Sequence, residues 1–451
     1  MSWNLSAQDI HRTACQGNIS RLDSLLQQTF IDVQDRQGRS LLHWTVACRQ
    51  KEVFSFLMDR DITLNTEDHT NQTPLHVAVR FGRDEYFALL IDAQPNNSWV
   101  DTYGASLMEV AIIDRSLKYV EKLLDQGIDI HSVNERGSTP LEIAQRIGAT
   151  DISDYLIQSG ADKNRVRAFT LTGEYMSQTM PTTQPVMFAP NVVSTEESEF
   201  GSVFNKAGDE FYYAVDVNGK NDIRYSKRNR DTWSKPEVIL SHDRYGYNDP
   251  FLSPDENRLY FISNRPLSGT GDPKEDIDIW YVERKGEGWS KPINAGTNIN
   301  TSGNEYYISF THDGTMYFAS NINATEENGP NDQDIYYSAF VDGEFQKPVP
   351  LGSSINTSSY EADAFVAPDE SYIIFGSTRE EGLGRGDLYI SFKNEDDSWS
   401  EAVNMGGIIN TVHHELCPFV TADGKYLFYT SDQDIYWIST QVIEELKKGQ
   451  H

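Results

Sequence analysis

The stretch that decides the fold runs from Tyr247 to Thr301. In order, it reads Tyr247-Asn248-Asp249-Pro250-Phe251-Leu252-Ser253-Pro254-Asp255, Leu259-Tyr260-Phe261-Ile262-Ser263, Asp278-Ile279-Trp280-Tyr281, Trp289-Ser290-Lys291-Pro292 and Ile299-Asn300-Thr301. The runs of Tyr, Phe and Ile predict β-strands, and the Pro, Asp and Gly clusters between them predict turns. We interpret the stretch as four short strands joined in sequence.

The same order of pieces occurs five times in the last three fifths of the chain. Strands at even spacing, repeated with a period of about 45 to 55 residues, indicate small sheets arranged around an axis. The sequence therefore predicts an all-β propeller of five blades over residues 184–441. The copies begin at Glu199, Tyr247, Glu305, Glu361 and Glu415.

The fifth copy stops near Thr440, before a fourth strand. A missing strand would leave an exposed sheet edge, which natural β proteins avoid. Residues 184–188, Gln-Pro-Val-Met-Phe, resemble the Lys347-Pro348 signal that announces an outer strand. We expect this N-terminal strand to complete the last blade and close the ring.

These copies resemble the Pro-Asp type of WD40-like repeat found in TolB-like propellers. The resemblance covers about residues 184–440 and rests on the Ser-Pro-Asp turn, the Tyr-Phe-x-Ser strand, the Asp-Ile-Tyr strand and the Trp-Ser-x-Pro ending. In that family the domain mostly serves as an interaction platform. The resemblance therefore implies a binding role, although this scaffold carries many functions.

A second repeat fills residues 9–165 with a period of 33 residues. Its full copies contain Ser40-Leu41-Leu42-His43, Thr73-Pro74-Leu75-His76, Ser106-Leu107-Met108-Glu109 and Thr139-Pro140-Leu141-Glu142, and a degraded first copy precedes them. A polar turn lies ahead of each full copy, and a helical pattern follows. Thr at the N-cap with Pro at the first helical position favours a helix start.

This second repeat closely resembles ankyrin repeats, which the Thr-Pro-Leu-His motif and its 33-residue period signal. The resemblance implies an α-helical solenoid of about five repeats over residues 1–165 that binds proteins through its hairpin tips and concave face. We predict Arg36, Asn71, Tyr103 and Arg136 as partner-binding tip residues. His43 and His76 are interpreted as structural, each hydrogen-bonding between adjacent repeats.

Two short segments complete the predicted organisation. Residues 166–183 are rich in Thr, Ser, Met and Gln without sustained periodicity, which predicts a linker or a draped segment. Residues 442–451 predict a short helical tail.

The first strands of the propeller carry the most suggestive acids. Because alternate residues of a strand share one face, we expect six carboxylates to line or border the central channel: Glu199, Asp249, Glu305, Glu361, Asp363 and Glu415. They could hold a cation, bind a sugar or divide acid and base roles as in glycoside hydrolases. The alternative is structural, because an acid that recurs in nearly every blade usually holds blades together.

No cofactor is expected from these motifs. Long acidic loops at residues 267–272 and 323–333 could hold Ca²⁺ through oxygen ligands, but their spacing matches no known calcium loop. The three cysteines show neither metal-type spacing nor a disulfide framework.

The formal net charge is −30, of which −23 falls after residue 165. Such a surface repels nucleic acid and anionic membranes. The start of the chain carries no signal peptide, and no apolar run is long enough to span a bilayer, so a cytoplasmic protein is expected. The oligomeric state stays open.

The sequence therefore predicts a non-enzymatic scaffold that binds other proteins through both modules. The alternative is a carbohydrate-active hydrolase, or a protein that binds a cation or a sugar, with carboxylates at the propeller mouth.

Overall fold

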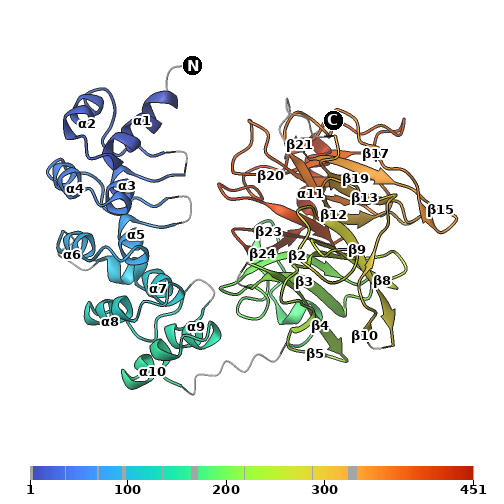
Figure 1. Cartoon of the computed structure of the whole chain (residues 1–451), viewed down its shortest axis with the longest axis horizontal. Helices are drawn as coiled ribbons and strands as arrows, with labels where there is room; N and C mark the ends of the chain where they lie inside the picture. Colours follow the sequence, from blue (N-terminus) through green and yellow to red (C-terminus); the bar gives the residue numbers. More distant parts are fainter. Residues whose placement is uncertain are drawn as a thin grey trace. The chain divides into compact units, whose positions relative to one another are not determined.

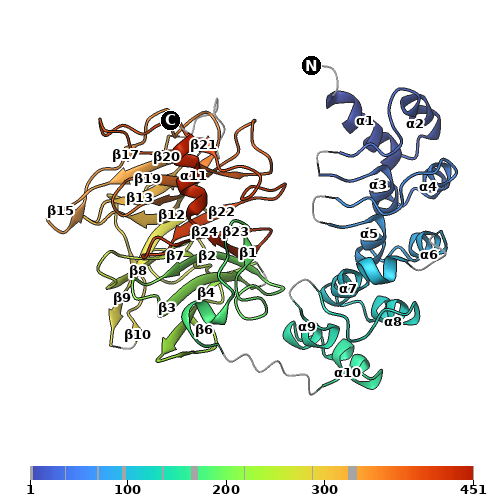
Figure 2. The same ribbon diagram turned by 180° about the vertical axis from the view of Figure 1, so that it is seen from behind.

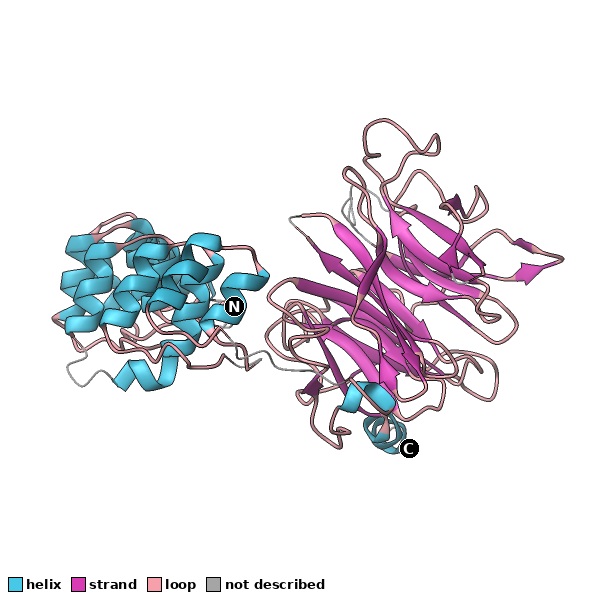
Figure 3. Ribbon diagram, turned by 90° about the horizontal axis from the view of Figure 1, so that it is seen from below, coloured by secondary structure: helices cyan, strands magenta, loops and turns pink. Residues whose placement is uncertain are grey.

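The computed structural model describes residues 4–35, 37–68, 71–93, 98–134, 137–163, 171–217, 219–286, 288–323 and 333–449, without the side chains of residues 4–9 and 98–105. The chain divides into two compact units, residues 1–168 and 169–451. The first is helical and the second consists mainly of β-strands (Figure 3).

The first unit is a stack of helical pairs in two layers (Figure 1). The inner layer contains α1 (Asn4–Cys15), α3 (Leu41–Cys48), α5 (Pro74–Arg80), α7 (Ser98–Ile113) and α9 (Pro140–Arg146). The outer layer contains α2 (Ile19–Leu26), α4 (Lys51–Met58), α6 (Asp84–Asp92), α8 (Leu117–Asp125) and α10 (Thr150–Gln158). Each inner helix contacts the next, and the buried residues of the unit form one continuous hydrophobic cluster. The predicted solenoid is confirmed.

The repeated polar motif starts each inner helix and also joins neighbouring repeats. The backbone N–H of Ser40 donates to His43 Nδ1 at 3.0 Å, while His43 Nε2 lies 2.8 Å from the carbonyl oxygen of Gln72 in the next repeat. His76 Nε2 lies 2.9 Å from Ser106 Oγ in the same way. These contacts confirm the structural interpretation of both histidines.

A disulfide joins Cys15 at the end of α1 to Cys48 at the end of α3. The prediction that the chain has no disulfide framework was wrong. The physical reason is the repeat itself, since residues 33 positions apart occupy equivalent places in stacked neighbours and lie side by side.

The turn predicted around Tyr103 is helical, because α7 runs from Ser98 to Ile113. Proline disfavours helical backbone at the residue before it, and Pro74 and Pro140 fix the starts of α5 and α9 in this way. The fourth repeat has Leu107 at the equivalent position, so its helix can extend further toward the N-terminus. Tyr103 is therefore not at a hairpin tip.

The second unit contains five antiparallel sheets of four main strands each, which confirms the five-bladed propeller (Figure 1). The first blade contains β2 (Ser198–Phe204), β3 (Glu210–Asp216), β4 (Asn221–Asn229) and β6 (Glu237–Leu240), and the second β7 (Asn248–Leu252), β8 (Arg258–Ser263), β9 (Asp278–Lys285) and β11 (Ile293–Asn294). The third contains β12 (Glu305–Phe310), β13 (Met316–Ser320), β14 (Asp334–Ser338) and β17 (Val349–Pro350), and the fourth β18 (Glu361–Val366), β19 (Tyr372–Ser377), β20 (Asp387–Phe392) and β21 (Val403–Asn404). Short strands add hairpins at the edges: β5 (Thr232–Trp233) on β4, β10 (Gly288–Trp289) on β9, and β15 (Phe340–Val341) with β16 (Glu344–Phe345).

The fifth blade is completed by the start of the unit, as predicted. Its strands are β22 (Leu416–Val420), β23 (Tyr426–Ser431), β24 (Asp434–Ser439) and β1 (Val186–Met187). Val186 pairs with Trp437 and Met187 with Tyr436, and the N–H of Phe188 donates to the carbonyl of Ile435 at 2.7 Å. The Phe188 side chain is fully buried among Phe204, Phe211, Phe428 and Trp437.

Part of the predicted linker belongs to the propeller. The short helix η1 (Glu174–Ser177) places the Tyr175 ring against Phe204, Tyr426 and Trp437, with ring centroids 5.4, 5.1 and 5.3 Å away. Met176 is buried, and Thr172 bridges to Thr232. The segment is therefore draped rather than free from residue 171 onward.

The predicted helical tail is α11 (Gln441–Gly449), visible against the propeller strands in Figure 2. Ile443 is buried, and Val442 and Leu446 pack against the propeller core.

Candidate functional site

Four of the six predicted channel acids form a repeated structural motif. Glu199, Glu305, Glu361 and Glu415 are fully buried. Glu305 accepts hydrogen bonds from the Thr301 N–H at 3.2 Å, the Thr301 hydroxyl at 2.6 Å and the Ser320 hydroxyl at 3.0 Å. The other three repeat this pattern in whole or in part: Glu361 with Thr357 and Ser377, Glu415 with Thr411 and Ser431, and Glu199 with Thr195.

These bonds tie the connector between two blades to the blade that follows. Burial raises the pKa of Glu305 to about 7, and it also raises the pKa values of Glu361 and Glu415. The contacts favour the structural interpretation of the four glutamates, because their oxygens are engaged by the chain itself. One of the four also has a basic neighbour, because Arg379 Nε lies 3.4 Å from Glu361 Oε1.

An asparagine in the same connector is a feature that the sequence analysis missed. The Ile279 N–H donates to Asn300 Oδ1 at 2.8 Å, and Asn300 Nδ2 donates back to the Ile279 carbonyl at 2.9 Å. Asn356 and Asn410 bind Ile335 and Leu388 identically. The signal was present in the recurrent Ile-Asn-Thr triplet.

Two residues beyond the glutamate position, every first strand contains a β-bulge. The residue there has positive φ in all five blades: Gly201 (52°), Asp249 (51°), Tyr307 (41°), Asp363 (54°) and Cys417 (53°). A bulge interrupts the alternation of side chains, so the glutamate and the residue two positions later do not share a face. We call these five residues the bulge ring.

Side chains of the bulge ring bind the backbone of other ring members. The Asp249 carboxylate accepts from the Tyr307 N–H, and the Asp363 carboxylate accepts from the Cys417 N–H. The Cys417 thiol donates to Asp249 Oδ1 at 3.6 Å. A Cβ at Gly201 would lie 3.2 Å from the same oxygen, so glycine leaves room for the acid.

Asp249 and Asp363, the other two predicted channel acids, are thus brought together at the axis. Burial, followed by the proximity of Asp363, raises the pKa of Asp249 well above its usual range, and burial also raises the pKa of Asp363. Burial also raises the pKa of the Cys417 thiol, which favours its neutral, unreactive form.

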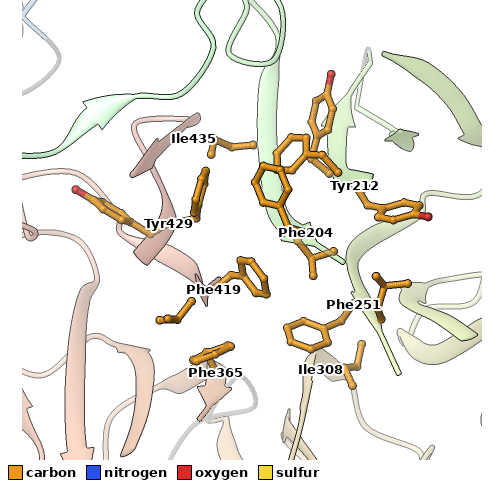
Figure 4. Packing of buried hydrophobic residues seen from close by; sticks show 14 of the residues in the cluster. Phe204, Tyr212, Phe251, Ile308, Phe365, Phe419, Tyr429 and Ile435 are labelled. Atoms are coloured by element: carbon orange, nitrogen blue, oxygen red, sulfur yellow. The ribbon is translucent and has the colours of Figure 1, made fainter. Parts of the chain in front are cut away.

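Two residues further along three of these strands, Phe251, Phe365 and Phe419 converge and form an aromatic plug (Figure 4). The ring centroid of Phe251 lies 6.5 Å from that of Phe365 and 6.0 Å from that of Phe419, and the centroids of Phe365 and Phe419 are 5.9 Å apart. On its far side the plug faces a mainly apolar funnel of about 520 Å³, which Leu252 and Val420 also line.

At the end of the channel where the first strands begin lies a second cavity of about 410 Å³. Asn248, Asp249 and Tyr306 line it, together with Lys220 and Arg244. The Asn248 Oδ1 atom is buried without a hydrogen-bond partner among the described residues.

The predicted ankyrin tip residues are described only in part. Arg36 and Arg136 lie outside the described residues. Tyr103 lies in α7, in the part of that helix whose side chains are not described. Asn71 is exposed with φ of 55° and occupies the repeat position of Gly38 and Gly137, both at 74°. Asparagine tolerates this left-handed conformation, so the turn geometry accounts for Asn71 without a partner.

The inner helices expose two large apolar side chains near their C-terminal ends. Phe81 follows α5 and is 50% exposed, and Ile113 ends α7 and is 44% exposed. Arg80 occupies the repeat position equivalent to Ile113, and Asp114 the position equivalent to Phe81. Both of these charged residues are also exposed. We call these four residues the helix-end row.

Within the described part of the chain, no group of three or more His, Cys, Asp or Glu is placed to hold a metal ion, and no helix is both long and apolar enough to cross a membrane. Most of the acidic loop at 323–333 lies outside the described residues, so its proposed Ca²⁺ site stays a prediction.

Comparison with known proteins identifies the first module. Residues 10–101 match the ankyrin repeat family in three copies. A stretch of 49 residues is 47% identical to protein phosphatase 1 regulatory subunit 27 of Homo sapiens and of Mus musculus. The stretch covers 11% of this chain and 32% of each relative, so the chain spans about a third of the length of these proteins. Residues 10–101 are therefore ankyrin repeats, and they are followed in the same chain by a five-bladed β-propeller.

Proposed function

We propose that this chain is a non-enzymatic scaffold whose ankyrin stack holds a partner protein along its inner helices. The observation that carries this proposal is the helix-end row. Phe81 and Ile113 are about half exposed at the ends of consecutive inner helices, and the exposed residues Arg80 and Asp114 occupy the repeat positions equivalent to Ile113 and Phe81. Exposed large apolar side chains with charged residues beside them in the sequence are typical of protein-binding surfaces.

The similarity to a phosphatase regulatory subunit supports a protein partner in general, because that relative is named for acting on another protein. The propeller supplies the second module. Its glutamates hold blades together, which favours a platform over a catalytic pocket.

The proposal is tested in the full chain with the double substitution Phe81→Ser and Ile113→Ser. Proteins crosslinked to the wild-type chain in its native cell are identified, and the recurrent partner is purified for a binding titration. We expect at least roughly tenfold weaker binding by the double variant, as for loss of a central apolar anchor. Phe30→Ser is the matched control, because Phe30 is 87% exposed and lies outside the helix-end row.

A second arm replaces the predicted tip residues Arg36, Tyr103 and Arg136 together. Weaker binding with an unchanged melting temperature would extend the surface to these positions. The scaffold proposal fails if the partner binds the double variant as tightly as the wild type. It also fails if the purified chain hydrolyses a glycoside and Asp249→Asn removes that activity.

A further inference from the structure

Several arginines lie in the turns that join the inner helices of the ankyrin stack to the outer helices. Arg49 follows α3, Arg80 and Arg83 flank the turn between α5 and α6, Arg115 lies between α7 and α8, and Arg146 ends α9. Arg83 is partly buried and the other four are exposed. We call these five residues the arginine edge. It gathers positive charge although residues 1–165 contain more acidic than basic side chains.

Contacts between the turns of neighbouring repeats make this edge continuous. Arg83 Nη2 donates to the Ala47 carbonyl of the preceding repeat at 3.1 Å, and Arg115 Nη2 donates to the Ile147 carbonyl of the following repeat at 2.6 Å. With one further carbonyl each, these two side chains use two donors. A guanidinium group has five N–H donors, so both keep donors for a ligand.

The lysines near these turns are paired with acids, whereas the arginines are not. Lys51 pairs with Glu85, and Lys118 pairs with Asp84. Apart from Arg146, no member of the arginine edge has an acid of the described chain within salt-bridge distance. The acids available in these turns are therefore used by lysines, and the guanidinium charges stay uncompensated.

Two of the guanidinium groups are also close enough to repel each other. Burial, followed by the proximity of Arg49, lowers the pKa of Arg83. Arg80 attracts the Asp114 carboxylate of the next repeat from beyond salt-bridge distance. An anion that binds across these side chains would offset the repulsion between them.

Two apolar side chains lie among the arginines. Phe81 is 50% exposed, and the guanidinium carbon of Arg83 lies 5.6 Å from the centroid of its ring. Ile113 is 44% exposed and precedes Arg115 by two residues. A nucleic-acid backbone gains nothing from such groups, and a net charge of −30 repels it. A peptide supplies acidic and apolar side chains together, so the mixed surface favours a peptide.

Resting on the proposed function, we propose that the partner protein presents an extended acidic segment to the arginine edge. Its Asp or Glu side chains bind the guanidinium groups, which suit carboxylates through paired hydrogen bonds, and its apolar side chains cover Phe81 and Ile113. Packed helices lie about 8–10 Å apart and an extended chain advances about 3.3 Å per residue. An acid at roughly every third position therefore meets successive repeats.

The test is a fluorescence anisotropy titration of the full chain with a labelled synthetic peptide. This spaced peptide has four Asp residues, one at every third position, with Leu beside the two middle ones and Ser or Gly elsewhere. One control peptide has Asn for every Asp, and another has the same composition with its Asp residues consecutive. We expect the Asn peptide to bind at least roughly tenfold more weakly than the spaced peptide, and the consecutive peptide roughly fivefold more weakly. Raising the ionic strength from about 0.05 M to about 0.5 M should weaken the spaced peptide.

Substitutions locate the bound peptide on the chain. Neither Arg49 nor Arg80 donates a side-chain hydrogen bond within the described chain, so the double variant Arg49→Gln and Arg80→Gln should keep the wild-type melting temperature. It should bind the spaced peptide roughly fivefold more weakly. Arg60→Gln is the matched control, because exposed Arg60 already pairs with Asp23. Phe81→Ser should weaken the spaced peptide but not a version with Ser for Leu.

The proposal is overturned if the spaced peptide does not bind, or if the Asn peptide binds as tightly. It is also overturned if single-stranded DNA binds more tightly than the spaced peptide and the arginine double variant weakens both equally. The partner found by crosslinking separates the two proposals. If the Phe81→Ser and Ile113→Ser variant loses that partner while the arginine double variant keeps it, the scaffold proposal stands and the acidic-segment proposal fails. If only the arginine double variant loses the partner, the reverse holds.

Discussion

In the ankyrin stack, the repeated polar motif connects each repeat to the next along an open line, as when His43 contacts Gln72. In the propeller, the Thr–Glu motif likewise connects each blade to the next, but here the series of blades is closed into a ring by the pairing of β1 with β24. An open stack distributes its stability over neighbouring contacts. A closed ring depends in addition on one contact between distant parts of the chain, so the two modules should respond differently to damage.

The largest effect is expected from opening the ring. A chain that begins at Glu199 lacks β1, Phe188 and Tyr175, whereas one that begins at Thr170 keeps them. We expect the shorter chain to aggregate or to unfold without a cooperative transition, because its fifth blade exposes an edge and its aromatic cluster loses two rings. Circular dichroism melts and size-exclusion chromatography measure this. Equal melting temperatures for the two chains would contradict a closure role for β1.

The next effect concerns the core of the open stack. Leu75 is 1% exposed, so Leu75→Ala should lower the free energy of unfolding of the ankyrin unit by about 2–5 kcal/mol. The propeller transition should not move. Calorimetry of the full chain resolves the two transitions, and Leu383→Ala, at a 54% exposed position, is the control. A shift of both transitions would show that the modules unfold together.

The disulfide tests how far the first repeat depends on its neighbour. Reducing Cys15–Cys48, or replacing both residues by Ser, should destabilise the ankyrin unit by roughly 4 kcal/mol, since the bridge spans 33 residues. Intact mass measured on protein from the native cell would also test the predicted cytoplasmic location, because cytosolic thiols are normally kept reduced. An unchanged melting temperature on reduction would indicate that stacking alone holds the repeat.

The smallest effect is a pH dependence in the connector motif. The pKa of Glu305 is raised to about 7 in the fold, so its contribution to stability is present at low pH and is lost as the pH rises through about 7. Glu305→Gln imitates the protonated acid. The wild type should therefore be favoured over this variant most at pH 5 and least at pH 9, while exposed Glu401→Gln shows no such trend. If the stability of the wild type relative to Glu305→Gln grew with pH, the prediction would be wrong.

The architecture of both modules could be predicted from the sequence because each module repeats its motifs with a regular period. The 33-residue spacing predicted the helical stack, and the unfinished fifth copy predicted the pairing of residues 186–187 with β24. The disulfide could have been predicted from the same spacing. Cys15 and Cys48 are one period apart, and equivalent residues of stacked repeats lie side by side.

The site was less predictable, for a local reason. A period-two reading of the first strand placed Glu361 and Asp363 on one face, and the bulge between Ala362 and Phe365 separates them. A bulge depends on how two strands pair, which one strand's pattern does not contain. The aromatic plug was hidden similarly, because Phe251, Phe365 and Phe419 meet only when the first strands of three different blades converge.

The bulge ring is where the propeller departs from its own symmetry. Glutamate recurs in four blades at one position, yet two residues later five equivalent positions carry Gly, Asp, Tyr, Asp and Cys, all with left-handed backbone. Tyr307 and Cys417 accept a conformation that costs such residues about 1 kcal/mol or more, so the backbone geometry is kept while the side chain varies. In this propeller, the blades share the connector residues that support the fold, whereas the side chains of the bulge ring, along the axis, differ from blade to blade. Chains assembled from the same repeat should therefore differ in ligand through these five positions before they differ in fold.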